Sequence, residues 1–327
     1  GGALTLFGIR ASTVTEGKRF AFVSREGALV FNNVMLSAIL GIVLFGTLYP
    51  LVTEAFDTKV SVGPPYFNPM GAVFFVPMLL VMMVGPLLRW RQDNLRRVAQ
   101  PLAMPWIAIL MMGAILLAAT AWIGFLPYLG LVLAMGLAVA SFLPLRQGGL
   151  RRTPLATWGM VISHLGVAVA LYGMASESAF SEEKLVAVSE GQTTEVGPWK
   201  VRLNTIQPIA GPNWTALEAD MFASYKGGGE AEIRPQSRNF WSPPQQTSES
   251  ALVTRWNGQL YAVIGGEAED GRWQLRLWWK PFVTLIWYGG LMIGFGGLLV
   301  LIGRVRADLR RHVARGKIAD RRESQGR

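Results

Sequence analysis

The sequence contains no cysteine and only two histidines among its 327 residues. Without cysteine the chain cannot form a disulfide, supply a thiolate metal ligand or use a cysteine nucleophile. Zinc takes three or four protein ligands, and the apolar run around the histidine at position 164 cannot supply them there. A domain of this chain exported to an oxidising compartment must therefore fold on its apolar core alone.

Charged residues are scarce as well, at 16% of the sequence, and several catalytic motifs are missing. The sequence has no Walker phosphate-binding loop, no GxSxG and no HExxH. Apart from His164, the long apolar runs hold no charged side chain or histidine deep inside them. Because ion-coupled transporters usually carry acidic residues within the membrane, the sequence disfavours a secondary transporter.

Apolar residues are abundant: the sequence is 51% hydrophobic and has a mean hydropathy of +0.33. A helix needs about 20 apolar residues to cross the hydrocarbon core of a bilayer. Six runs approach or exceed this length, which predicts a polytopic α-helical membrane protein with about six transmembrane helices. The predicted helices cover residues 31–52, 68–88, 103–123, 126–145, 154–175 and 281–303.

The formal net charge of +10 is unevenly distributed. When the loops are assigned alternately to the two sides of the membrane, one side collects 20 of the 31 Lys and Arg residues but only 6 of the 21 acids. Excess Lys and Arg marks cytoplasmic loops, so the basic excess reports topology and argues against a nucleic-acid partner. This side comprises residues 10–30, 89–100, 146–153 and the tail from Arg304.

Between the fifth and sixth predicted helices the composition shifts to acids, Gly and Pro, with alternating patterns such as WKVRLNTI (199–206). Alternation with a period of two is typical of half-buried strands. Turn signals divide the region into about six strands, which suits a small β-sandwich or barrel on the exported side. The predicted organisation is a cytoplasmic basic loop (1–30), a five-helix transmembrane region (31–175), a periplasmic β-rich domain (176–280), a last transmembrane helix (281–303) and a basic cytoplasmic tail (304–327).

His164 is the candidate ligand within the predicted helices. Small residues recur on its helix at alternating spacings of three and four, which makes a face that another helix backbone can approach. His164 lies about 100° from Ser163, on the shoulder of this stripe, so we expect it to face a helix seam or a cavity. The stripe consists of Ala156, Gly159, Ser163, Gly166, Ala170 and Gly173.

Two interpretations of His164 stay open from the residues alone. It is either a structural histidine hydrogen-bonded across a helix interface, or an axial ligand of a haem iron, which needs only one or two side chains. Counted from Thr153, it lies roughly 16 Å along the helix, near mid-membrane.

The other histidine, His312, falls in the basic tail and is expected to be a solvated residue. Trp278, Trp279, Trp287 and Tyr288 flank the last helix and are expected to belong to its aromatic belt.

Several stretches of the sequence resemble a known family. Each is weak alone, but their order and spacing together resemble the C-terminal half of the CcmF family, the integral membrane haem-lyase component of bacterial cytochrome c maturation. The matching stretches are SREGALVFNN (24–33), GTLYPLVTEAF (46–56), GPPYFNPM (63–70), WGMVISHLGVAVALYGMA (158–175), GPNW (211–214) and WQLRLWWKPFVTLIWYGG (273–290).

This resemblance implies a multi-pass protein of the bacterial inner membrane that joins haem vinyl groups to the two cysteines of a CxxCH site in an exported apocytochrome. It implies that His164 is one of two axial ligands of haem b held at the exported face. Haem would come from the haem chaperone CcmE, and apocytochrome through a CcmH-type partner.

The second axial histidine, the family's tryptophan-rich segment and the histidines of a second haem would lie in the missing N-terminal half. The chain is therefore expected to be one piece of a longer or split protein and inactive alone. No catalytic residue is assigned. The alternative functions are a non-catalytic haem-handling or export component and a membrane assembly scaffold.

Overall fold

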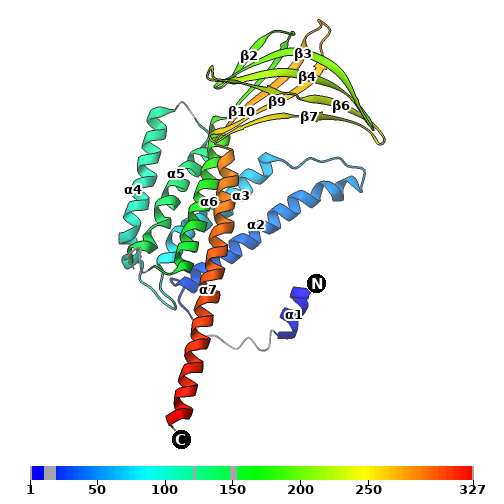
Figure 1. Cartoon of the computed structure of the whole chain (residues 1–327). Coiled ribbons are helices and arrows are strands. Elements are labelled where there is room, and N and C mark those ends of the chain that lie inside the picture. The colour runs from blue at the N-terminus through cyan, green and yellow to red at the C-terminus, as the bar shows by residue number, and fades with distance from the viewer. Residues whose placement is uncertain (1, 11–19, 121–122, 148–152, 326–327) are drawn as a thin grey trace. The chain divides into compact units, whose positions relative to one another are not determined.

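The structure is a computed structural model that describes residues 2–10, 20–120, 123–147 and 153–325, with side chains described only as far as residue 310 in the last helix (Figure 1). The chain divides into two compact units, Gly1–Met104 and Pro105–Arg327. Six helices in the described part are long and apolar enough to cross a membrane. Together with a β-sandwich they confirm the predicted fold class, a polytopic α-helical membrane protein with an inserted β domain.

The first unit contains two long helices, and a third helix, α4, runs from it into the second unit. Helix α2 begins six residues before the predicted run because the Ser24 hydroxyl accepts a hydrogen bond from the Gly27 N–H at 3.0 Å and caps it. The segments are α1 (Gly2–Arg10), α2 (Arg25–Glu54), α3 (Pro64–Val84), the short 3₁₀ segment η2 (Gly85–Leu87) and α4 (Leu95–Ala119).

The loop between α3 and α4 is fixed by Asp93, whose side chain is only 2% exposed. Its carboxylate accepts hydrogen bonds from the Arg89 N–H at 2.8 Å, the Asn94 N–H at 2.7 Å and the Arg97 guanidinium, with which it also forms an ion pair. Its own N–H donates to the Val23 carbonyl at 2.9 Å. The hydrogen bond from Arg97, and then those from the backbone, hold the pKa of the Asp93 carboxyl far below its usual range.

The second unit holds the remaining helices and the β domain. Helix α7 extends far beyond the predicted end of its apolar run at residue 303, because the basic tail is rich in Arg and also contains Ala, and both residue types favour helix. The segments are α5 (Phe125–Ser141), the 3₁₀ segment η3 (Leu143–Gln147), α6 (Leu155–Phe180) and α7 (Thr284–Gln325).

The β domain has ten strands in two antiparallel sheets, so the expectation of about six strands was wrong. One sheet has the order β1-β10-β9-β8; the other has the order β2-β3-β4-β6-β7, with β5 also paired to β4. Strands such as QSRNFW and PQQTSE are mostly polar and have no regular apolar alternation, so the pattern could not reveal them. The strands are β1 (Glu182–Val188), β2 (Thr193–Val196), β3 (Trp199–Gly211), β4 (Trp214–Tyr225), β5 (Glu230–Ile233), β6 (Gln236–Trp241), β7 (Pro244–Glu249), β8 (Ala251–Arg255), β9 (Gly258–Glu267) and β10 (Trp273–Pro281).

Both sheets contribute to one apolar core, which includes Trp199, Met221, Leu260, Leu277 and Trp279. The first and last strands of the domain are neighbours, with Glu182 of β1 opposite Trp279 of β10. They continue directly into α6 and α7, so the sandwich lies at one end of this helix pair (Figure 1).

Candidate functional site

Helix α6 carries His164 in its first half. The helix begins at Leu155, so His164 is nine residues along it, about 13–14 Å from that end. Near the other end Glu177 forms an ion pair with Lys280 of β10 at 3.3 Å. Since Glu177 is thirteen residues from His164, about 20 Å of helix separates the histidine from the β domain.

Helix α7 packs on α6 through glycines of both helices. A Cβ on Gly166 would lie 2.7 Å from the Gly289 carbonyl oxygen, and a Cβ on Gly159 would lie 2.4 Å from that of Gly296. The Ser163 hydroxyl donates a hydrogen bond to the Ile293 carbonyl at 3.2 Å. The sequence prediction that the small-residue stripe is a close helix-packing face is confirmed.

Another side of α6 faces α5. A Cβ on Gly130 of α5 would lie 2.8 Å from the Ala175 Cβ and 3.9 Å from a methyl group of Leu171. His164 shares the helical row of these two residues, because separations of seven and eleven residues are close to whole turns. Since α5 and α6 run antiparallel, His164 lies beside the last turns of α5, which ends at Ser141.

The His164 side chain is half-buried. Among the described residues its imidazole has no hydrogen-bond, ion-pair or ring partner. A structural histidine held across a helix interface needs such a partner, because an unpaired polar group in an apolar setting is costly. Within the described residues, the imidazole is therefore available to an external atom, which both a metal and another protein segment could supply.

His164 offers a metal one candidate nitrogen ligand. The described residues contain no group of three or more His, Cys, Asp or Glu side chains that could hold a metal ion. A single neutral imidazole matches an axial position of haem, whose porphyrin supplies the remaining in-plane nitrogens. The side chain of His312, in the continuation of α7, lies outside the described side chains.

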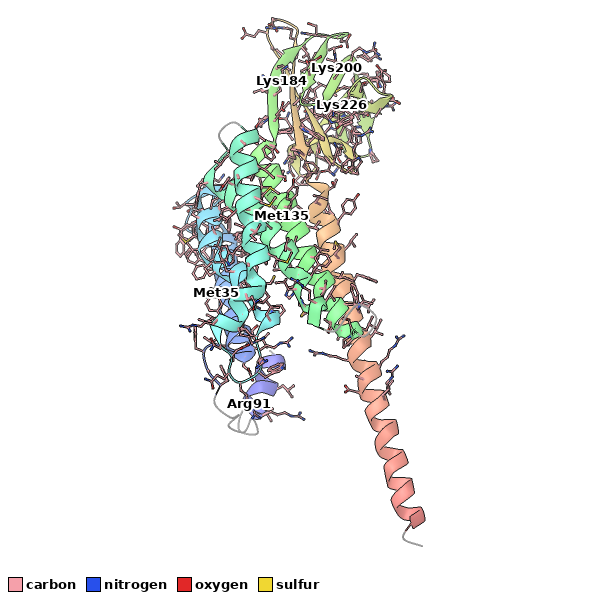
Figure 2. The ribbon with its side chains drawn as sticks, turned by 90° about the vertical axis from the view of Figure 1, so that its left-hand side faces the viewer. Met35, Arg91, Met135, Lys184, Lys200 and Lys226 are labelled. Atoms are coloured by element: carbon pink, nitrogen blue, oxygen red, sulfur yellow. The ribbon has the colours of Figure 1, made fainter. Side chains whose placement is uncertain are left out.

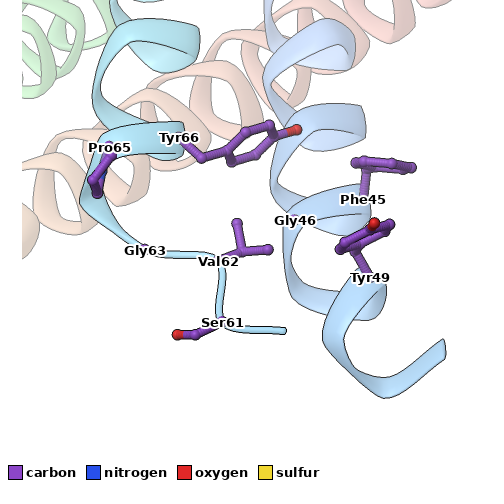
Figure 3. A pocket seen from close by; sticks show the side chains of 8 residues that line it. All are labelled: Phe45, Gly46, Tyr49, Ser61, Val62, Gly63, Pro65 and Tyr66. Atoms are coloured by element: carbon purple, nitrogen blue, oxygen red, sulfur yellow. The ribbon is translucent and has the colours of Figure 1, made fainter. Parts of the chain in front are cut away.

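Two cavities lie elsewhere, and neither is lined by His164. One, of about 420 Å³, lies in the first unit between the end of α2 and the start of α3. Tyr66 and Val62 point toward α2 there, with Phe45 and Tyr49 on that helix (Figure 3). The other, of about 580 Å³, lies on the sandwich and includes Lys184 and Lys200 among its lining residues (Figure 2).

The tryptophans expected at the membrane border divide into two sets. Trp279 is 7% exposed and lies in the sandwich core, so it does not belong to an aromatic belt, whereas Trp278 is half-buried with its ring edge-on to Tyr261. Trp287 and Tyr288 on α7 are 71% and 47% exposed, as a belt requires. Trp256, in the turn between β8 and β9, is 73% exposed.

The fold defines the class of protein: a polytopic membrane protein with six apolar helices in its described part and an inserted β-sandwich. His164 gives it a candidate metal-ligand position. The model of the CcmF C-terminal beta-sandwich matches residues 179–281. The chain is 36% identical to the cytochrome c-type biogenesis protein CycK of Bradyrhizobium diazoefficiens, covering 93% of this chain and 48% of that protein. It is 34% identical to CcmF of Escherichia coli, covering 92% and 47%.

A solved structure named Cytochrome c Heme Lyase CcmF is also similar, with a TM-score of 0.69 and 25% sequence identity over 86% of this chain and 46% of that one. The resemblance predicted from the sequence is thereby confirmed, and the chain corresponds to the C-terminal half of the CcmF proteins. The names of these relatives describe them as proteins of cytochrome c biogenesis. The chain spans about half the length of the curated relatives that it matches.

Proposed function

We propose that this chain supplies the C-terminal part of a haem lyase that attaches haem to the CxxCH site of apocytochrome c, and that His164 is an axial ligand of the haem iron. The similarity to the relatives extends over more than nine-tenths of the chain, and the names of these relatives support the reaction class. The observation that carries the residue assignment is the half-buried imidazole without a partner among the described residues.

The residues around His164 prepare it for this role. On one side of α6, the Gly159–Gly296 and Gly166–Gly289 contacts bring the α7 backbone close and fix the helix. On the side of α6 that carries His164, Leu171 and Ala175, the neighbouring helix α5 limits the directions in which the imidazole can turn. Half-burial restricts water that would compete for the iron. Haem itself supplies the vinyl groups to which thiols add, while the chain supplies position and surroundings.

The depth of His164 bears on where the haem is held. The resemblance implies a haem at the exported face, yet about 20 Å of helix lies between His164 and Glu177. A later start of α6 does not resolve this, because the helix begins only two residues after Thr153. We therefore propose that His164 binds iron within the membrane thickness, and that the attachment step needs a path from this depth to the exported side.

The remaining assignments form part of the same proposal. The second axial ligand comes from the N-terminal half of the protein, haem b from a CcmE-type chaperone, and apocytochrome through a CcmH-type partner. The β domain faces the periplasm, since 20 of the 31 Lys and Arg residues lie in the loops and tail assigned to the opposite side.

The test replaces His164 by Ala in the complete protein, with His312→Ala as the matched control. We expect His164→Ala to insert at the normal level but to lose bound haem and most holo-cytochrome c, measured by haem staining and by the absorption spectrum of the purified protein. Free imidazole should partly restore both. His164→Met should retain protein and shift the haem spectrum, because a thioether replaces a nitrogen on the iron.

The competing functions predict other results. A structural histidine predicts a lower protein level, no imidazole rescue and an unchanged spectrum of the remaining haem. A non-catalytic haem-handling component predicts that His164→Ala abolishes bound haem while an assay supplied with free haem still yields holo-cytochrome c. An assembly scaffold predicts that the wild-type complex has no haem spectrum attributable to His164.

A further inference from the structure

The turn between β8 and β9 is hydrogen-bonded to the chain where it enters the membrane-spanning helix α7. The Phe282 N–H donates to the Asn257 carbonyl at 2.8 Å, and the Thr284 hydroxyl donates to the Trp256 carbonyl at 2.9 Å. Thr284 is the first residue of α7 and is 4% exposed. The backbone of Trp256 is therefore fixed at the level where the last transmembrane helix begins.

The side chains of this turn point outward although its backbone is tied down. Trp256 is 73% exposed, whereas Trp199 and Trp279 in the adjoining core are 2% and 7% exposed. Arg255 is exposed as well, with its guanidinium 4.6 Å above the Tyr225 ring. An indole and a guanidinium thus lie together at the end of the sandwich that joins the helices.

Helix α7 continues the same arrangement. Trp287, one turn after Thr284, is 71% exposed, and Leu291 on the following turn is also 71% exposed. The exposed side chains therefore become less polar along this surface: Arg255 and Trp256 in the turn, then Trp287, then Leu291. A bilayer has the same order, from polar headgroups to hydrocarbon.

We infer that the β8–β9 turn is a membrane anchor of the β domain, with the Trp256 indole among the lipid headgroups and Arg255 able to contact lipid phosphate. The indole ring is apolar but its N–H needs a polar partner, and the headgroup region satisfies both. Arginine binds phosphate oxygens well because its donors match their geometry.

This contact gives the sandwich a third attachment to the membrane, in addition to its covalent connections to α6 and α7. Those two connections lie side by side, because β1 pairs with β10. On their own they permit the domain to tilt about the line that joins them. An anchor at the β8–β9 turn lies two strands away from β1 in the order β1-β10-β9-β8 and restricts this tilt. The inference is independent of haem binding and of the proposed function.

Because this chain has no cysteine, a thiol introduced into it can be tested in the complete protein once any cysteine of the N-terminal half is replaced by serine; the protein is reconstituted in phosphatidylcholine vesicles. Trp256→Cys and Glu269→Cys each introduce a single thiol for an environment-sensitive fluorophore. Glu269 lies in the β9–β10 turn, at the opposite end of β9 and about 30 Å from the β8–β9 turn along that ten-residue strand. It is a matched control on the same hairpin.

We expect the label at position 256 to emit at shorter wavelength than the label at 269 and to be quenched by lipids brominated near the headgroup. The label at 269 should be quenched only by an aqueous quencher. Aqueous quenching of both labels would overturn the inference. Protection of position 256 from both quenchers would also overturn it, because protein would then cover the turn.

A second measurement keeps position 256 free of a fluorophore. Trp256→Asp should increase aqueous accessibility of a thiol at position 254 (Thr254→Cys), whereas Trp256→Tyr should leave it unchanged, because tyrosine shares the preference of tryptophan for the membrane interface. Equal accessibility in both backgrounds would contradict the anchor.

Discussion

At the scale of single residues, Asp93 shows how one carboxylate can organise a loop between two membrane helices. Its pKa is lowered first by the hydrogen bond from Arg97 and then by the backbone N–H groups of Arg89 and Asn94. A folded-state pKa below the unfolded value, which is about 3.9, stabilises the fold above that pH. The stabilisation is lost as the pH falls below the unfolded value toward the folded one.

The first prediction follows from this sign. At neutral pH, Asp93→Asn should lower the midpoint of thermal unfolding, because the amide loses the charge and cannot accept the same set of hydrogen bonds. The difference between wild type and variant should shrink as the pH is lowered below about 4. A difference that does not depend on pH would show that the charge of Asp93 is not what stabilises the loop.

The second residue-scale prediction concerns the sandwich core. Leu277 is fully buried between the sheets, whereas Leu252 on the same sheet is 53% exposed. Leu277→Ala should reduce the free energy of unfolding by about 2–5 kcal/mol, because it leaves a cavity. Leu252→Ala should change it by less than about 0.5 kcal/mol. Unfolding can be followed by the fluorescence of Trp199 and Trp279, which share this core; equal losses would contradict the assigned core.

At the scale of elements, the α6–α7 pair depends on backbone contact. A Cβ on Gly289 would lie 2.5 Å from the Gly166 carbonyl oxygen, but a Cβ on the adjacent Gly290 meets nothing within 4 Å. Gly289→Val should therefore separate the helices and destabilise the protein by about 1–3 kcal/mol or more. Gly290→Val is the matched control and should be close to neutral. Melting of the two variants in detergent measures the difference, and similar melting temperatures would refute the packing.

How well the elements could be predicted depended on the physical signal each one carries. The α6 stripe was identified correctly because close helix packing requires small residues at helical spacing. The start of α2 was missed because it depends on a Ser24 cap that lies outside the apolar run. The helical continuation of α7 was missed because the end of an apolar run marks the end of a membrane span and not the end of a helix.

The candidate site was predictable only in part, for a related reason. His164 is conspicuous because a lone histidine in an apolar run is unusual, and its place on the shoulder of the stripe follows from helix geometry. The lack of a partner for its imidazole depends on contacts with other helices, which spacing does not reveal. The setting of Trp256 could not be predicted because it depends on hydrogen bonds between distant residues: Thr284 donates to Trp256, and Phe282 donates to the neighbouring Asn257.

At the scale of the whole molecule, the charge distribution yields a topology prediction that the absence of cysteine makes simple to test. Single cysteines at Lys200 and Lys226, on the sandwich in Figure 2, should react with a membrane-impermeant reagent added from the periplasmic side. A cysteine at Arg91, in the loop before α4, should react only after the membrane is opened. The reverse pattern would contradict the proposed orientation of the chain.

The pairing of β1 with β10, described above as the join between the sandwich and the helices, also sets an order of events during biogenesis. Strand β1 is synthesised early, but its neighbour β10 follows only after the whole intervening domain has been synthesised. Contacts between such distant segments form late and slowly. Until they form, α7 does not cover the glycine face of α6. The nascent chain therefore passes through a stage in which this incomplete helix pair is accessible to quality-control proteases and insertion factors.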